Sequence, residues 1–172
     1  MSENIIFEEK QKFKQFWIKI LVLFVGIIVI STFGWGFIKQ IILKQTWGSK
    51  PMPDSALILF FCFSFILGIG LPLLIFKANL KTKVTENGLS IKFFPFHLKF
   101  KPIPLKDIKN IQALEYHPIK EYGGWGIRGF KKKRAYNVSG NKGVLIEYEE
   151  RTLLIGSQKA EELEKVLKTI KI

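Results

Sequence analysis

The residues with the clearest chemical potential lie in one segment, EYGGWGIRGFKKKR, from Glu121 to Arg134. Its glycines surround Trp125 and Arg128, two residue types that are enriched at binding hot spots. We expect a long connection between strands here that binds a protein partner through Tyr122, Trp125 and Arg128, because binding residues are often displayed on loops. The alternative is structural: the glycines make a corner and Trp125 fills the end of a barrel.

The same segment ends in a basic run, whose members are Lys131, Lys132, Lys133 and Arg134. Each basic residue near an anionic membrane leaflet contributes about 1 kcal/mol of attraction. We therefore expect this run to contact an anionic lipid surface, and the alternative is a solvated loop.

Groups that could carry catalysis or hold a metal are few. His97 and His117 are the two histidines, and neither has ligand spacing with the other or with Cys62. Gly124, Gly126 and Gly129 match G-x-G-x-x-G, but no amphipathic helix follows them, and a dinucleotide site needs that helix. We predict no catalytic residues, no metal and no cofactor. Nucleic acid is also not expected, because no recognition motif accompanies the charge of +13.

Two apolar runs are expected to anchor the chain in a membrane and so to hold the segment 121–134 near the bilayer. The first spans residues 20–38 and the second residues 55–76, and neither contains a charge. As helices, the apolar runs at residues 20–38 and 56–76 are about 28 and 31 Å long, which matches the roughly 30 Å hydrocarbon core of a bilayer. Pro72 cannot donate a hydrogen bond to the Gly68 carbonyl group, so the second helix should kink or loosen there.

The distribution of basic residues predicts the orientation. Eight lysines flank the outer ends of the two spans, at Lys10, Lys12, Lys14, Lys19, Lys77, Lys81, Lys83 and Lys92. Only Lys39, Lys44 and Lys50 lie in the connecting loop. This asymmetry predicts a multi-pass membrane protein with both termini in the cytoplasm. The expected order is a cytoplasmic segment (1–19), a first span (20–38), an external loop (39–54), a second span (55–76) and a cytoplasmic domain (77–172).

Alternating apolar residues predict seven antiparallel strands in residues 77–172. They are expected at residues 80–85, 89–94, 97–102, 108–116, 134–138, 144–149 and 152–156. Asn87-Gly88 indicates a tight turn between the first two. After Ser157, a plausible N-cap, a helix is predicted whose apolar stripe includes Leu163 and Leu167. We expect this helix to close a strongly bent sheet.

Seven such strands followed by one helix, together with the phrase IPLKDIKNI at residues 103–111, resemble the pleckstrin-homology-like (PH-like) membrane protein families of bacteria. The resemblance implies an α+β protein in which a transmembrane hairpin precedes a PH-like barrel closed by a C-terminal helix. It carries little information about activity.

The leading functional expectation, with the location that the resemblance implies, is a non-enzymatic, membrane-anchored PH-like scaffolding module of the bacterial inner membrane. It is expected to bind a protein partner and, in addition, an anionic lipid surface. The alternative is a small membrane enzyme or lipid-handling protein with a site between the hairpin and the soluble domain. Its residues would be Gly68, Gly70, Pro72, Trp125 and Arg128.

Overall fold

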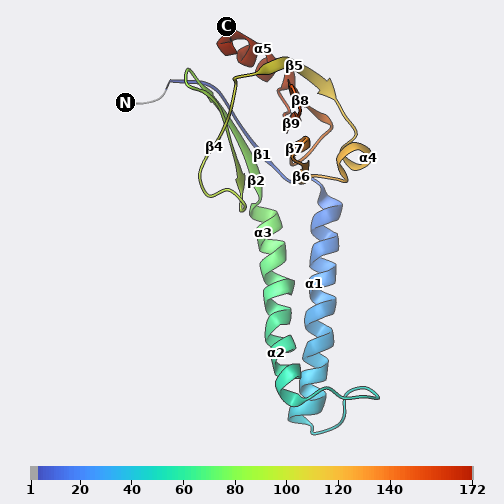
Figure 1. The fold of residues 1–172 in the computed structure, drawn as a ribbon. Helices are drawn as coiled ribbons and strands as arrows, with labels where there is room; N and C mark the ends of the chain where they lie inside the picture. The colour runs from blue at the N-terminus through green and yellow to red at the C-terminus, as the bar shows by residue number, and fades with distance from the viewer. Residues whose placement is uncertain (1–3, 172) are drawn as a thin grey trace. The chain divides into compact units, whose positions relative to one another are not determined.

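The chain divides into two compact units, one helical and one built on sheets (Figure 1). The computed structural model describes residues 4–171. The helical unit contains residues 15–76, and the sheet unit combines the chain up to Lys14 with the chain from Lys77 onward. The helical unit is therefore inserted into the sequence of the sheet unit.

The helical unit contains two helices that are long and apolar enough to cross a membrane. The first comprises α1 (Phe16–Phe37) and a π-helical turn (Ile38–Ile42). The second comprises α2 (Asp54–Phe65), a π-helical turn (Ile66–Gly70) and α3 (Leu71–Lys77). They have 27 and 24 residues and mean hydropathies of 2.5 and 2.6. Both predicted apolar helices are found, with longer ends than expected.

Small residues bring the two helices together. A Cβ atom added at Gly26 would lie 2.6 Å from the Gly68 carbonyl oxygen, and one added at Gly68 would lie 2.6 Å from Ile30 Cδ1. Gly70, in contrast, has no neighbour within 4 Å of an added Cβ atom. The π-helical turn ends directly before Leu71, so the helix loosens next to Pro72 as expected.

The first sheet of the sheet unit, sheet A, has the antiparallel order β1-β2-β3-β4. Its strands are β1 (Ile5–Lys12), β2 (Asn79–Thr85), β3 (Gly88–Phe94) and β4 (Lys101–Ile103). Strand β1 was not expected, because residues 1–19 were predicted to be a segment without strands that precedes the first apolar helix. It pairs with β2 along its length, from Ile5 opposite Thr85 to Lys12 opposite Asn79.

Strand β1 is bound to the rest of the sheet unit by its inward face. Phe7 is 3% exposed and belongs to the main apolar core. Gln11 Nε2 donates a hydrogen bond of 2.6 Å to the Gly156 carbonyl oxygen. Glu9 accepts hydrogen bonds from the Ser157 hydroxyl (2.6 Å) and from the Gln158 backbone N–H (2.9 Å).

The strand expected at residues 97–102 was wrong in most of its length. Only Lys101–Ile103 pair with β3, and residues 95–100 form turns and bends. The alternation that suggested a strand comes from Leu98 and Phe100, which are 73% and 40% exposed. Alternation alone does not make a strand, because the backbone groups also need a partner strand.

The second sheet, sheet B, has the order β5-β8-β9-β7-β6. Its strands are β5 (Ile108–Glu115), β6 (Gly126–Phe130), β7 (Lys133–Asn137), β8 (Lys142–Tyr148) and β9 (Thr152–Gly156). Strands β7 and β9 run parallel, whereas all strands were expected to be antiparallel. Within residues 4–171 there are thus nine strands in two sheets that are not closed into a barrel.

The main core joins both sheets and the last helix, α5 (Ala160–Lys171). On β3, the predicted inward residues Leu89, Ile91 and Phe93 are at most 2% exposed. On α5, Leu163 and Leu167 are fully buried in the same cluster. The alternation of β3 and the inward stripe of the last helix are therefore confirmed. The molecule is an α+β protein, and its PH-like assignment stays a prediction.

Candidate functional site

The glycine-rich segment is a short helix followed by a β-hairpin instead of the expected long loop. Helix α4 (Pro118–Tyr122) ends at Gly123, whose φ of 70° is left-handed. Strand β6 then pairs with β7, with Gly129 opposite Arg134 and Phe130 opposite Lys133. A Cβ atom at Gly129 would overlap the Lys133 carbonyl oxygen, so only glycine fits at this position. Glycines carry no apolar pattern, which is why β6 had no signal in the sequence.

Trp125 and Arg128 both form hydrogen bonds inside this segment. Trp125 Nε1 donates to the Gly140 carbonyl oxygen at 3.0 Å, and Arg128 Nε donates to the Trp125 carbonyl oxygen at 2.9 Å. The Gly126 N–H donates to Asn137 Oδ1 at 2.9 Å. These hydrogen bonds lie within the segment and its neighbouring turn, so they are consistent with the structural alternative. Arg128 is nevertheless exposed, and its binding of a partner stays a prediction.

Tyr122 connects α4 to the base of the hairpin. Its ring meets the ring of Tyr116 edge-on at 5.8 Å, and Lys133 Nζ lies 4.8 Å from its centroid. Burial raises the pKa of the Tyr122 hydroxyl, and the nearby Glu121 carboxylate raises it further. Tyr122 is therefore a half-buried neutral phenol, and its role in partner binding also stays a prediction.

The tip of the hairpin presents one apolar side chain among cations. Lys131 and Lys132 form the turn, Lys133 starts β7, and all three are exposed. Phe130, directly before them, is 91% exposed. The lysines were predicted from the sequence to face a lipid surface, whereas Phe130 was not, although it lies between a glycine and a basic run.

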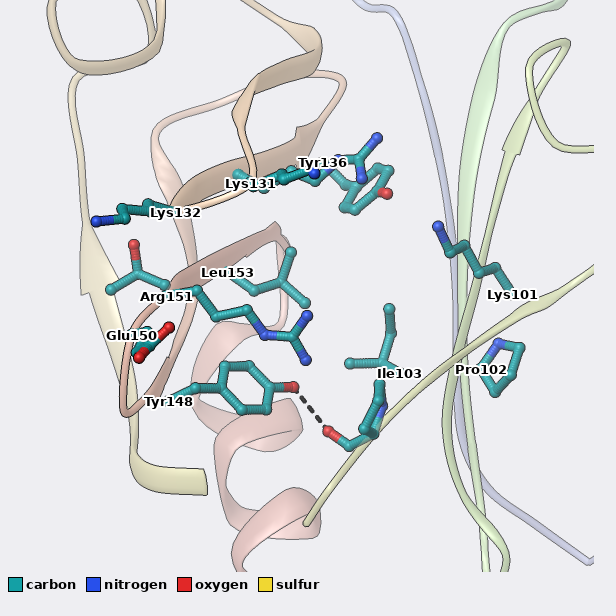
Figure 2. A pocket seen from close by; sticks show the side chains of 13 residues that line it. Lys101, Pro102, Ile103, Lys131, Lys132, Tyr136, Tyr148, Glu150, Arg151 and Leu153 are labelled. Atoms are coloured by element: carbon teal, nitrogen blue, oxygen red, sulfur yellow. Dashed lines mark hydrogen bonds between the residues drawn. The ribbon is translucent and has the colours of Figure 1, made fainter. Parts of the chain in front are cut away.

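A cavity of about 580 Å³ lies in the sheet unit between β4 and the β7, β8 and β9 strands (Figure 2). Five cationic side chains line it, from Lys101, Lys131, Lys132, Arg134 and Arg151. Glu150 is the one acidic residue in the lining. Within residues 4–171, none of these five cations forms an ion pair. The cavity therefore carries a strong excess of positive charge.

Aromatic rings hold two of these cations in place. The Arg151 guanidinium lies 4.4 Å from the Tyr148 ring centroid, and the Arg134 guanidinium lies 5.3 Å from that of Tyr136. The Tyr148 hydroxyl in turn donates a hydrogen bond of 2.7 Å to the Pro104 carbonyl oxygen (Figure 2). Because Tyr148 belongs to sheet B and Pro104 follows the last strand of sheet A, this bond links the two sheets at the cavity.

The ionisation of His97 reflects the same positive charge. Burial lowers the pKa of its imidazole, and the charges of Lys101 and Arg134 lower it further. The His97 ring lies 5.7 Å from the ring of Tyr136. A neutral imidazole beside the cavity is thus favoured, because a further cation there would be repelled.

The cavity was not predicted from the sequence. Of its cations, Lys131, Lys132 and Arg134 belong to the basic run, whereas Lys101 and Arg151 come from distant segments. No motif connects these segments, and the structure alone brings them together. Among residues 4–171, no group of three or more His, Cys, Asp or Glu side chains could hold a metal ion.

Residues 2–169 match the profile of a family of unknown function, DUF6141. No curated protein and no solved structure matches the chain. Because the match covers nearly the whole sequence, this protein belongs to the family of unknown function DUF6141.

Proposed function

We propose that this protein is a membrane-anchored binding module of the bacterial inner membrane whose sheet unit rests on anionic lipid through the tip of the β6–β7 hairpin. The observation that carries the proposal is Phe130, a phenylalanine that is 91% exposed directly before three exposed lysines. Large exposed aromatic residues beside cations are typical of interfacial membrane contacts. The two apolar helices supply the anchor.

The pairing of β1 with β2 supports an even number of membrane crossings. Strand β1 precedes the first apolar helix, and β2 follows the second. The two strands are hydrogen-bonded neighbours, which supports a topology with the outer ends of both helices on one side of the membrane. The excess of lysines at those ends supports the cytoplasmic side.

The energetics of the hairpin suit a tethered contact. Each lysine near an anionic surface contributes about 1 kcal/mol. Burial of a phenylalanine side chain contributes about 1.5–3 kcal/mol. Neither contribution would bind a free protein strongly to a membrane. The anchor, however, keeps the hairpin at a high effective concentration near the bilayer. Exposed Phe96 and Leu98, beside Lys99, offer a second contact of the same kind.

The proposal is tested with the full chain reconstituted into vesicles. Cys62 is the single cysteine, so a Cys62→Ser background allows one environment-sensitive dye to be attached at Lys132→Cys. We expect lipid-borne quenchers to quench this dye in phosphatidylcholine vesicles that contain phosphatidylglycerol, and salt to weaken the quenching. Phe130→Ser should reduce it.

The matched control carries the dye at Glu161→Cys, on the exposed face of α5. This position should stay unquenched in every lipid mixture. Equal quenching at both positions, or quenching at Lys132→Cys that ignores phosphatidylglycerol, would refute docking by the hairpin.

A protein partner is the second part of the proposed scaffolding role. Its support is the exposed Arg128, which lies on an edge strand of sheet B. We expect Arg128→Ala to keep the melting temperature and to lose a copurifying protein. Trp125→Ala should instead destabilise the fold, because its indole hydrogen bond and packing are removed. A stable Arg128→Ala protein that retains all its partners would leave this segment with a structural role only.

A further inference from the structure

The cavity between β4 and sheet B has features that docking on a membrane surface does not require. Lys101 reaches it from β4, and Arg151 reaches it from the turn between β8 and β9 (Figure 2). Neither residue belongs to the hairpin tip. The two cations come from opposite walls, so a ligand between them would be held from two sides.

The Arg151 guanidinium is held by aromatic and hydrogen-bond contacts within the protein itself. The Tyr148 ring supports the Arg151 guanidinium at 4.4 Å, and the hydrogen bond from Tyr148 to the Pro104 carbonyl oxygen fixes that ring. A guanidinium presents several N–H donors in one plane, which match the oxygens of phosphate. Prior positioning lowers the entropy cost of binding.

We propose that this cavity binds a phosphate-bearing organic anion. A ligand with a single carboxylate needs only one arginine to pair with it. Five cationic side chains and one acidic side chain line this cavity, and this excess of positive charge favours a ligand group with more than one negative charge. Ile103 and Leu153 line the same cavity and offer an apolar wall for the carbon part of the ligand. A phosphorylated lipid headgroup and a soluble phosphate ester share this chemistry.

His97 serves as the reporter for an NMR test. The full chain, labelled with ¹³C-histidine in zwitterionic micelles, has two histidine signals, and His117→Gln assigns them. We expect inorganic phosphate to shift the His97 signal saturably and to raise its pKa toward 6.5, because a bound anion offsets the charges of Lys101 and Arg134. Sodium chloride at equal ionic strength should not do this.

Charge-removing variants locate the site. Lys101→Gln and Arg151→Gln should each weaken the response to phosphate about tenfold or more, since each removes a charge-assisted hydrogen bond. Arg151→Lys keeps the charge without the planar guanidinium and should fall between. Lys109→Gln is the matched control, because it removes the same charge at an exposed ion pair with Glu149 outside the cavity. Phe130→Ser should leave the phosphate response unchanged, which separates this site from membrane docking by the hairpin.

Nanodiscs with and without phosphatidic acid distinguish the two sources of phosphate. A His97 shift that appears only with phosphatidic acid identifies a lipid headgroup, and one that inorganic phosphate saturates without this lipid identifies a soluble ester. Both results support the proposal. It is overturned if neither probe gives a saturable His97 shift, or if the response survives both Lys101→Gln and Arg151→Gln.

Discussion

Strand β1 should decide whether the sheet unit can fold. Its key residue is Phe7, which is 3% exposed and packs in the core that joins both sheets. Replacement of a buried phenylalanine by alanine costs about 3–5 kcal/mol, and domains of this size are stable by about 5–15 kcal/mol. Phe7→Ala should therefore remove a large part of the free energy of unfolding.

The assay uses a chain without the helical unit. Because Lys12 lies opposite Asn79, a short Gly-Ser linker from Lys14 to Lys77 can replace the helices. We expect this joined chain to unfold cooperatively in urea, and Phe7→Ala to lower its midpoint strongly. Ile6→Ala is the control, since Ile6 is 43% exposed on the same strand. A fragment of residues 80–172, which lacks β1, should show no cooperative transition.

Two results would refute this reasoning. One is a fragment of residues 80–172 that unfolds at the same urea concentration as the joined chain. The other is a loss of stability in Phe7→Ala no larger than in Ile6→Ala. Either result would mean that β1 pairs with the edge of sheet A without contributing to the free energy of unfolding.

Three further predictions concern the helix, the helical unit and pH. Leu163→Asp should unfold the joined chain, because a carboxylate would replace a fully buried side chain, and an unchanged thermal melt would contradict this. Gly68→Leu should separate the two apolar helices, because even a Cβ atom there would lie 2.6 Å from Ile30 Cδ1 and 2.9 Å from the Gly26 carbonyl oxygen. Gly70→Ala should be tolerated, because nothing lies within 4 Å of an added Cβ atom. The yield of crosslinks between the two helices measures both effects. The pKa of His97 is lowered in the folded chain, so the unfolded chain binds the His97 proton more tightly. The neutral imidazole therefore contributes its full stability above the ordinary pKa of 6.5. This stability is lost as the pH falls through the lower pKa of the folded chain. His97→Gln should reduce this acid sensitivity in urea unfolding measured across that range.

The predictable parts of the fold are those whose side chains alternate without interruption. On β3, Leu89, Ile91 and Phe93 point inward and leave polar residues outside, so the pattern identifies the strand. On α5, the helical stripe through Leu163 and Leu167 does the same. In these elements, local pattern and tertiary packing agree.

The missed strands lack that agreement. The inward face of β1 continues from Phe7 through Glu9 and Gln11, two polar residues whose hydrogen-bond partners lie beyond residue 155. Strand β6 is rich in glycine and ends in the exposed Phe130. Neither shows apolar alternation. The candidate site was harder still, because Lys101 and Arg151 meet only when the two sheets pack.

The insertion of the helical unit between β1 and β2 has a consequence for biosynthesis. As the ribosome makes the chain, β1 emerges before both apolar helices and stays without its partner until β2 has followed them. If both helices cross a membrane, as proposed above, a chain that inserts only one of them would leave β1 and β2 on opposite faces of the membrane, where they cannot pair. In such a chain Val84, which is fully buried and opposite Phe7 in the complete sheet unit, would lose this neighbour, and the unpaired strand would be open to proteases. Under that proposal, formation of the sheet unit would require that both helices have inserted.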